Sequence, residues 1–243
     1  MSTLEPTESG YLEGSTEFRR PVRHIFCPSP APMAPQGAAP PLLTALHGQG
    51  MSAEGFRRVL RHLPPTGHAQ LFPEGPYVFE RREPQGIRAG HGWYIYLGDS
   101  DDFRRELDRT EAHLLHVLDA VEEQHGTTDR ARSVLLGFSQ GGYLAGYVAL
   151  RHPERFGGLV ISAARLKHEF LTMELTRAPL PAVLLLHSPD DPATPFARAE
   201  ESRDVLAAAG ADVELFSHPG GHRLPAEALL RVEAWLAERG LVR

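Results

Sequence analysis

Ser139 is the residue that most plainly suggests chemistry, because it lies at the centre of Gly-Phe-Ser-Gln-Gly at positions 137–141. A G-x-S-x-G segment between a strand and a helix forms a sharp turn that exposes the serine hydroxyl as a nucleophile. Both flanks fit, since an apolar run precedes the segment and a helical pattern at 143–151 follows it. A glycine-rich turn of a nucleotide-binding domain is the alternative, but the chain contains neither G-x-G-x-x-G nor G-K-[ST]. The residues therefore predict nucleophilic catalysis by Ser139.

A serine hydroxyl attacks well only when a base takes its proton, and a carboxylate behind the base fixes the tautomer of the imidazole. The chain offers these groups in the order serine, acid, histidine, which is one of the known orders. Asp190 and Asp191 follow an apolar run at 182–187. Asp191 is the preferred acid because Pro192 directly after it helps to fix a tight turn beyond the strand. Asp190 stays as the alternative.

Two histidines near the C-terminus are candidates for the base. His222 follows Gly220 and Gly221, which permit a loop that carries the imidazole back over the end of the sheet. His218 lies at the end of the strand expected at 213–216, and we expect a structural role for it. The predicted catalytic residues are therefore Ser139, Asp191 and His222.

Acyl transfer through a serine also needs donors for the negative oxygen that develops on the substrate carbonyl. Preorganised backbone N–H groups lower this barrier by about 3 to 4 kcal/mol. One donor is the residue after the nucleophile, here Gln140, and the other lies in a loop after an earlier strand. The loop His-Gly-Gln-Gly at 47–50 fits, with Gln49 as the donor, although an ordinary glycine turn has the same composition.

The candidate residues follow the ends of apolar runs, and these runs alternate along the chain with amphipathic segments. Strands are predicted at 42–46, 68–72, 135–136, 158–163, 182–187 and 213–216. Helices are predicted at 52–63, 101–124, 143–151, 196–209 and 225–238, with Ser52 as the cap of the first. Such alternation indicates an α/β fold with a mostly parallel sheet and helices on both faces, in which ligands bind beyond the carboxyl ends of the strands.

The chain is predicted to form one domain with an N-terminal extension. Residues 1–40 contain possible edge strands at 15–26 and a proline-rich loop at 28–41, and residues 41–243 form the predicted catalytic domain. The stretch from 73 to about 98 is rich in Gly, Pro and aromatic residues, which predicts a long irregular loop with a functional role. The segment 164–180 is too short for a separate cap domain.

Composition and charge exclude several classes of protein. Hydrophobic residues make up 42% of the 243 residues and charged residues 23%, which is ordinary for a globular protein. A net charge of −6 argues against nucleic acid as a partner. The N-terminal residues lack an apolar leader and no run is long enough to span a membrane, so the sequence predicts a cytoplasmic protein without membrane insertion. Cys27, the single cysteine, cannot form an internal disulfide and fits that compartment.

The sequence suggests neither a metal site nor a cofactor. His113 and His116 share a helix face, but no third ligand is spaced to join them. We therefore expect catalysis by side chains and backbone alone, with a small-molecule ester or thioester as substrate. The oligomeric state is left open.

Several segments are shared with a known family. They are GFSQGG at 137–142, LHGQG at 46–50, DPATP at 191–195, GGH at 220–222 and RHPERFGG at 151–158. These segments resemble the phospholipase/carboxylesterase branch of the α/β-hydrolase superfamily, which includes acyl-protein thioesterases. The resemblance implies an α/β-hydrolase fold without a large cap domain. Ser188 and Pro189 stand where the family usually has a glycine before the acid.

The resemblance also implies where a substrate binds. Trp93, Tyr94 and Tyr96 are expected to line an acyl groove, and a short flap that includes Phe170 is expected at 166–173. Packing in the core is the alternative for these side chains, because aromatic residues dominate cores generally.

The chain is thus predicted to be a serine hydrolase that cleaves carboxylic esters or thioesters through an acyl-enzyme on Ser139. A hydrolase-fold protein that binds a ligand without turnover is one alternative. A serine peptidase is another, although no charged specificity pocket is visible in the sequence. The complete set of predicted catalytic groups favours the esterase.

Overall fold

A computed structural model gives the fold and describes residues 4–6, 12–14, 21–29, 39–126 and 128–242. Its centre is a seven-stranded sheet in the order β11-β10-β9-β8-β4-β5-β3. Neighbouring strands pair in parallel except at the edge, where β3 runs antiparallel to β5. The strands are β3 (His24–Cys27), β4 (Leu42–Leu46), β5 (Ala69–Pro73), β8 (Val134–Phe138), β9 (Gly158–Ser162), β10 (Ala182–His187) and β11 (Val213–Ser217).

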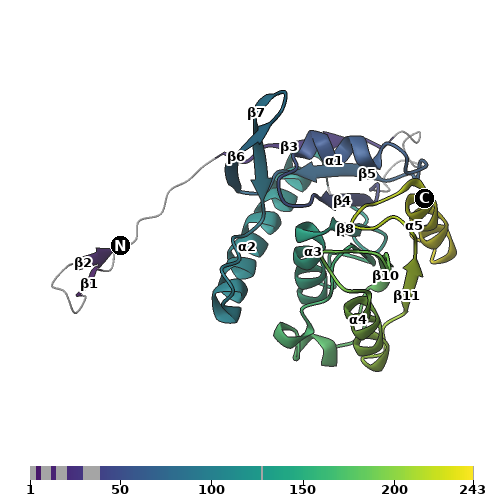
Figure 1. Ribbon diagram of the computed structural model, residues 1–243. Helices are drawn as coiled ribbons and strands as arrows, with labels where there is room; N and C mark the ends of the chain where they lie inside the picture. The colour runs from purple at the N-terminus through teal and green to yellow at the C-terminus, as the bar shows by residue number, and fades with distance from the viewer. Residues whose placement is uncertain (1–3, 7–11, 15–20, 30–38, 127, 243) are drawn as a thin grey trace.

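Helices cover both faces of this sheet (Figure 1). They are α1 (Ala53–Leu60), α2 (Ser100–His125), α3 (Gln140–Arg151), α4 (Phe196–Ala208) and α5 (Ala226–Glu238). α1 and α5 pack on one face through side chains such as Phe56 and Trp235. α2, α3 and α4 pack on the other through Leu107, Leu144 and Leu206. The predicted architecture, a mostly parallel sheet between helices, is confirmed.

Successive residues of a central strand enter different cores. In β10, Val183 and Leu185 pack toward α2, α3 and α4, whereas Leu184 and Leu186 pack toward α1 and α5. A strand covered on both faces needs apolar residues at every position and reads as a continuous apolar run. This explains why the bounds of β4 and β10 agree with the sequence prediction at both ends.

Local signals also place the helices. The Oγ of Ser52 accepts a hydrogen bond from the N–H of Gly55 at 3.1 Å and caps α1, as predicted. The predicted helix at 101–124 is α2, one residue longer at each end, and α3 begins three residues earlier than predicted. β3 overlaps the edge strand expected within 15–26, but residues 15–20 and 30–38 lie outside the described residues.

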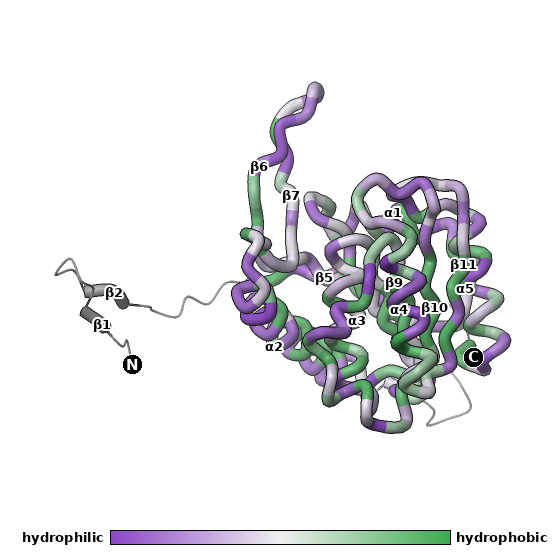
Figure 2. Tube along the Cα trace, turned by 60° about the horizontal axis from the view of Figure 1, so that its bottom comes forward, coloured by the Kyte–Doolittle hydropathy of each residue, from purple (hydrophilic) through white to green (hydrophobic). Residues whose placement is uncertain are grey.

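The stretch from 73 to 98 corrects the prediction of an irregular loop. β6 (Tyr77–Glu83) and β7 (Gly86–Gly92) pair antiparallel along their whole length. The hairpin stands out from the body of the sheet, and its tip is hydrophilic (Figure 2). Because most of its side chains are exposed on both faces, it lacks the alternation of apolar and polar residues that reveals a strand in a sequence.

The remaining elements are short. β1 (Leu4–Pro6) and β2 (Leu12–Gly14) pair antiparallel as a separate ribbon. Between β9 and β10 the chain forms two 3₁₀ turns, η1 (His168–Phe170) and η2 (Glu174–Thr176). No helix in the described ranges is long and apolar enough to cross a membrane. The predicted boundary between the N-terminal extension and the catalytic domain stays a prediction.

Candidate active site

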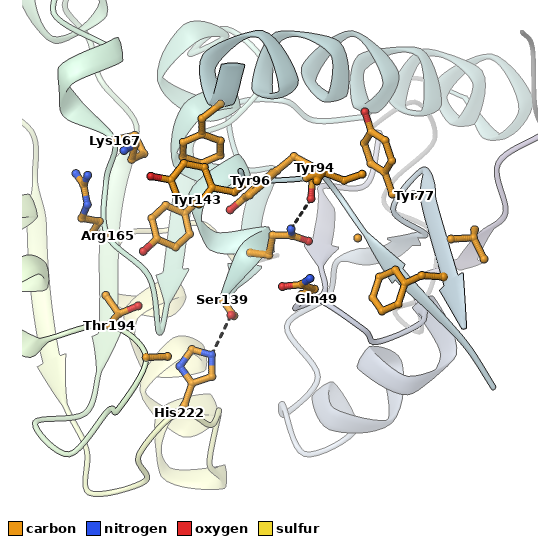
Figure 3. A pocket seen from close by; sticks show the side chains of 17 residues that line it. Gln49, Tyr77, Tyr94, Tyr96, Ser139, Tyr143, Arg165, Lys167, Thr194 and His222 are labelled. Carbon is orange, nitrogen blue, oxygen red and sulfur yellow. Dashed lines mark hydrogen bonds between the residues drawn. The ribbon is translucent and has the colours of Figure 1, made fainter. Parts of the chain in front are cut away.

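Three side chains meet beyond the carboxyl ends of β8, β10 and β11. Ser139 lies between β8 and α3, Asp191 in the loop after β10 and His222 in the loop after β11. The Oγ of Ser139 lies 2.9 Å from Nε2 of His222, and Nδ1 of His222 lies 2.8 Å from Oδ2 of Asp191. In Figure 3 the imidazole of His222 points toward the hydroxyl of Ser139. The structure therefore joins these residues in one hydrogen-bonded chain.

The backbone at Ser139 is strained. Its φ of 53° and ψ of −120° lie in a region that costs a non-glycine residue about 1 to 3 kcal/mol. The N–H of Ser139 donates to the carbonyl of Ser162 at 2.8 Å, which helps to hold the turn. A Cβ on Gly137 would lie 2.1 Å from the carbonyl oxygen of Gly141, and one on Gly141 would lie 2.3 Å from that of Leu46. Strand and helix thus approach too closely for any residue but glycine at both positions.

Asp191, and not Asp190, faces the imidazole. The carboxylate of Asp191 is fully buried and accepts hydrogen bonds from His222 and from the N–H groups of Ala193 at 2.8 Å and Thr194 at 3.0 Å. Burial opposes its ionisation, but the hydrogen bonds outweigh burial and hold the pKa of the Asp191 carboxyl below its usual value. Asp190 is exposed. A charged carboxylate therefore stands behind His222.

His218 lies apart from this chain of hydrogen bonds. Its side chain is buried, and its Nδ1 accepts a hydrogen bond from the N–H of Gly220 at 3.2 Å. Burial lowers the pKa of His218, so its imidazole stays neutral. The ring thus supports the loop that carries His222.

Ser188 connects the loop of Asp191 to the loop of His222. Its Oγ accepts hydrogen bonds from the N–H of Asp190 at 3.2 Å and from the N–H of Gly221 at 3.0 Å. The residue is completely buried. A glycine at this position would have no hydroxyl for this link.

Replacing Ser188 with alanine is expected to lower kcat about tenfold with little change in KM. The N–H of the half-buried Gly221 would lose its acceptor, and the cost should lie toward the lower end of the roughly 1 to 3 kcal/mol given by an unsatisfied buried donor. The His222 loop would then hold the imidazole less firmly, and the midpoint of urea unfolding would fall. Ser217→Ala, at an exposed serine of the same region, is the control. Wild-type kcat in Ser188→Ala would contradict the link.

Two backbone N–H groups are available near Ser139. Gln140 is the first residue of α3, where an N–H has no acceptor within its own helix. Gln49 lies in the loop after β4 and lines the same cavity as Ser139. Neither N–H has a hydrogen-bond acceptor in the part of the chain that the structure describes. The side chain of Gln140 is occupied by the N–H of Trp93 at 2.9 Å and the carbonyl of Tyr94 at 2.8 Å, which leaves only its backbone for a ligand.

The loop at 47–50 is fixed from below by buried groups. Nε1 of Trp93 donates to the carbonyl of His47 at 2.7 Å, and the N–H of Gly75 donates to Nε2 of His47 at 3.0 Å. Nδ1 of His47 therefore carries the proton and donates to the carbonyl of Gly48 at 2.8 Å. Burial lowers the pKa of His47 to about 4, so this neutral form persists at neutral pH.

The β6–β7 hairpin fixes the same loop from the side. The N–H of Gly50 donates to the carbonyl of His91 at 2.8 Å, and Nη1 of Arg81 donates to the carbonyl of Gly50 at 2.6 Å. Gly50 has a φ of 79°, which suits glycine. Loop and hairpin thus form one connected unit beside Ser139.

A cavity of about 610 Å³ opens onto Ser139 and His222 (Figure 3). Its aromatic side chains are Tyr77, Phe79, Tyr94, Tyr96, Phe103 and Tyr143, and its polar ones include Gln49, Arg165, Lys167 and Thr194. A mainly apolar pocket with a few polar groups near a nucleophile is typical of a small-molecule site.

The predicted substrate-binding residues separate into two groups. Tyr94 lines the cavity, as does Tyr96. Trp93 is completely buried and points into the protein, where its indole N–H bonds to His47. Phe170 packs edge-on against Phe103, with ring centroids 6.1 Å apart, and does not line the cavity. Packing inside the protein, the alternative to a role in substrate binding, therefore fits Trp93 and Phe170, and we do not propose that they contact substrate.

The flap expected at 166–173 also differs from the prediction. Leu166 and Leu171 are completely buried in the core beneath α3, and Met173 is exposed to solvent. None of the three lines the cavity beside Ser139. The segment instead contributes Lys167 to the cavity wall.

Sequence reasoning missed several residues of the cavity. Arg165 and Lys167 follow the carboxyl end of β9, so the rule that ligands bind at strand ends was a signal for them. Tyr77 and Phe79 come from the unrecognised hairpin and had no such signal. Within the described residues, no three His, Cys, Asp or Glu side chains gather in a way that would hold a metal ion.

The sheet order, the strained turn at Ser139 and the cavity at the strand ends together define the class of α/β-hydrolase proteins. A comparison with protein families narrows that class, because the phospholipase/carboxylesterase family matches residues 30–238. The chain belongs to this family. The predicted enzyme class, a carboxylesterase-like hydrolase, is thereby confirmed.

Individual relatives agree with this assignment. The chain is similar to acyl-protein thioesterase 1 of Gibberella zeae, at 32% identity over 79% of this chain and 85% of the relative. It is also similar to lysophospholipase-like protein 1 of Mus musculus, at 24% identity over 85% of this chain and 90% of the relative. The chain is also similar to the crystal structure of esterase PE8, with a TM-score of 0.71 and 26% identity. The match covers 89% of this chain and 98% of the PE8 chain.

Proposed function

We propose that the protein hydrolyses carboxylic esters or thioesters through an acyl-enzyme on Ser139. The observation that carries the proposal is the continuous hydrogen-bonded chain from Ser139 through His222 to Asp191, with distances of 2.9 and 2.8 Å. A nucleophile, a base and an orienting acid in this geometry are the groups that serine-based acyl transfer requires. The names of the relatives, a thioesterase and a lysophospholipase-like protein, suggest an acyl ester as substrate.

In the first half of the reaction the Oγ of Ser139 bonds to the carbonyl carbon of the substrate. Nε2 of His222 takes the hydroxyl proton, and the imidazolium that forms is stabilised by the buried carboxylate of Asp191. When the tetrahedral intermediate collapses, the bond to the leaving group breaks and Nε2–H returns the proton to the departing alcohol or thiol. The acyl group remains on Ser139.

The carbonyl oxygen becomes negative in both tetrahedral intermediates. The N–H groups of Gln49 and Gln140 are the proposed donors to this oxygen, because both are free and border the cavity beside Ser139. Each donor of this kind lowers the barrier by about 3 to 4 kcal/mol. Their support from buried groups and from the hairpin keeps them in place before substrate arrives.

In the second half a water molecule attacks the acyl-enzyme. His222 takes one proton of the water, the bond between the carbonyl carbon and Oγ breaks, and Ser139 regains its proton from the imidazolium. The products are a carboxylic acid and the free enzyme. These proton transfers require His222 and Ser139 alone, so the proposal includes neither a metal nor a cofactor.

A series of substrates tests this function. We expect turnover of p-nitrophenyl esters from acetate to palmitate and of matched acyl thioesters, with kcat/KM rising by up to about fourfold per added methylene. The rise should stop when the acyl chain fills the cavity of about 610 Å³. A fluorophosphonate should block all activity and form a single adduct on the peptide that contains Ser139. Cleavage of peptide amides without ester turnover would instead support a peptidase.

A further inference from the structure

Two positively charged side chains lie on one wall of the cavity. Arg165 and Lys167 follow β9 and line the cavity together with Ser139. Their side chains are only 19% and 12% exposed, so both head groups are largely shielded from bulk water. Figure 3 shows them on the same side of Ser139. Charges in such a site act more strongly on a ligand than charges on an open surface.

The positive charge on this wall is not fully neutralised. Arg165 donates to Glu169 through both Nη atoms at 3.0 and 2.8 Å, and Nζ of Lys167 lies 2.8 Å from the same carboxylate. Burial opposes the ionisation of Glu169, but the hydrogen bonds from Arg165 and Lys167 lower its pKa to about 2, so it is charged at neutral pH. The neighbouring Glu201 is paired with Arg198 at 2.8 Å. Two cations against one available carboxylate leave an excess of positive charge.

The head group of Lys167 packs against two aromatic rings. Nζ of Lys167 lies 5.0 Å from the ring centroids of both Phe103 and Phe170, within the range of cation–π contacts. The hydroxyls of Tyr143 and Thr194 line the same cavity and have no hydrogen-bond partner in the described part of the chain. An ammonium that is already held in place reduces the ordering that a ligand must impose when it binds, and the two free hydroxyls can donate hydrogen bonds to an anion.

The opposite wall has a different character. Tyr77 belongs to it, and Val78, Phe79 and Ile95, which are aliphatic or aromatic, line the same cavity. In Figure 3 Tyr77 lies on the other side of Ser139 from Arg165. A substrate whose scissile bond is at Ser139 therefore meets apolar groups in one direction and cations in the other.

We propose that Arg165 and Lys167 bind a carboxylate or phosphate group of the substrate, so that the protein acts on anionic esters. A guanidinium and an ammonium both form charge-assisted hydrogen bonds to the oxygens of either group, and Arg165 keeps N–H donors besides those that Glu169 and the carbonyl of Leu166 accept. The charge belongs to the acyl part or to the alcohol part of the ester, and the uncharged part lies along the aromatic wall. This inference rests on the proposed function, because it concerns the same cavity.

Pairs of chromogenic esters test the inference and locate the charge. Mono-p-nitrophenyl adipate carries a carboxylate on the acyl part, 3-carboxy-4-nitrophenyl hexanoate carries one on the leaving group, and p-nitrophenyl hexanoate carries none. A hydrogen bond to a charged group contributes enough to change affinity about tenfold to a hundredfold. We expect one of the charged esters to exceed the uncharged ester by such a factor in kcat/KM. Equal or lower values for both charged esters would overturn the inference.

Substitutions at the cations and at Glu169 should change the preference for charged esters in opposite directions. Arg165→Gln and Lys167→Gln should each reduce the ratio of kcat/KM between charged and uncharged ester about tenfold. Glu169→Gln removes the competing carboxylate and should raise the same ratio. Arg203→Gln, at a cation on α4 that does not line the cavity, removes an equal charge and should leave the ratio unchanged. A ratio that responds equally to Arg203→Gln and Arg165→Gln would reduce the effect to net charge and overturn the inference.

A binding measurement separates this inference from the proposed function. Calorimetry on Ser139→Ala protein compares monomethyl adipate with methyl hexanoate, together with a monohexyl ester of a dicarboxylic acid for the alcohol side. Binding at least tenfold tighter for a charged ligand supports the cationic wall even if ester turnover proves to depend on another residue. Equal affinity for charged and uncharged ligands overturns it, whether or not Ser139 is the nucleophile.

Discussion

Replacing Ser139 with alanine is expected to lower kcat for ester hydrolysis by about a million-fold. The variant lacks the only oxygen that lies 2.9 Å from Nε2 of His222 among the described side chains, so no acyl-enzyme can form there. Residual turnover would come from direct attack by water on a bound substrate whose carbonyl oxygen accepts hydrogen bonds from the free N–H groups. Stopped assays with an activated ester measure the loss of turnover, and a fluorophosphonate measures the expected loss of labelling.

A nearby serine provides the control for this variant. Ser162 lies in β9 next to the turn, and its hydroxyl is buried without a hydrogen-bond partner within the described residues. Ser162→Ala removes an oxygen of the same kind and should retain both activity and labelling. Circular dichroism should show the same fold for both variants, since alanine has the same backbone restrictions as serine. Labelling that persists in Ser139→Ala would place the nucleophile elsewhere.

Replacing Asp191 with asparagine is expected to lower kcat by about 10⁴, the loss given by the corresponding change in trypsin. The Asp191 carboxylate accepts the Nδ1 proton of His222 at 2.8 Å, which leaves Nε2 free to take the proton of Ser139. An amide can instead donate to Nδ1, and then the proton resides on Nε2 and the imidazole cannot act as a base. Single-turnover kinetics with one activated ester measure the loss of the acylation step.

The adjacent acid is the matched control. Asp190 is exposed, and its side chain makes no hydrogen bond to His222, so Asp190→Asn should change kcat less than threefold. Equal losses in both variants would mean that the acid lies elsewhere. A larger loss in Asp190→Asn would assign the role to Asp190.

Residues at the ends of buried strands were predictable because two local constraints coincide there. Ser139 lies where an apolar run meets glycines, and the close approach of strand and helix allows only those glycines. Asp191 and His222 have weaker signals, a following proline and a preceding glycine pair, but these also describe local backbone. The meeting of the three side chains follows from the parallel order of the strands, which the alternation of elements predicts.

Contacts between distant segments were less accessible to sequence reasoning. Trp93 and Tyr94 are adjacent aromatic residues, and only the tertiary structure places one in the core and the other on the cavity. Arg165 and Lys167 both pair with Glu169 in the following turn, and Lys167 also packs against Phe103 of α2. The role of Ser188 depends on the N–H of Gly221, 33 residues away.

The strained turn at Ser139 has a consequence for how this chain evolves. Glycine would adopt a φ of 53° and a ψ of −120° with little strain, whereas serine destabilises the fold there by about 1 to 3 kcal/mol. A lineage released from the need to cleave its substrate would therefore drift toward loss of the hydroxyl, since mutations to glycine would meet no structural barrier. Serine at position 139 is thus a residue that the backbone alone would not favour, and the proposed nucleophilic role gives a reason for it that folding does not.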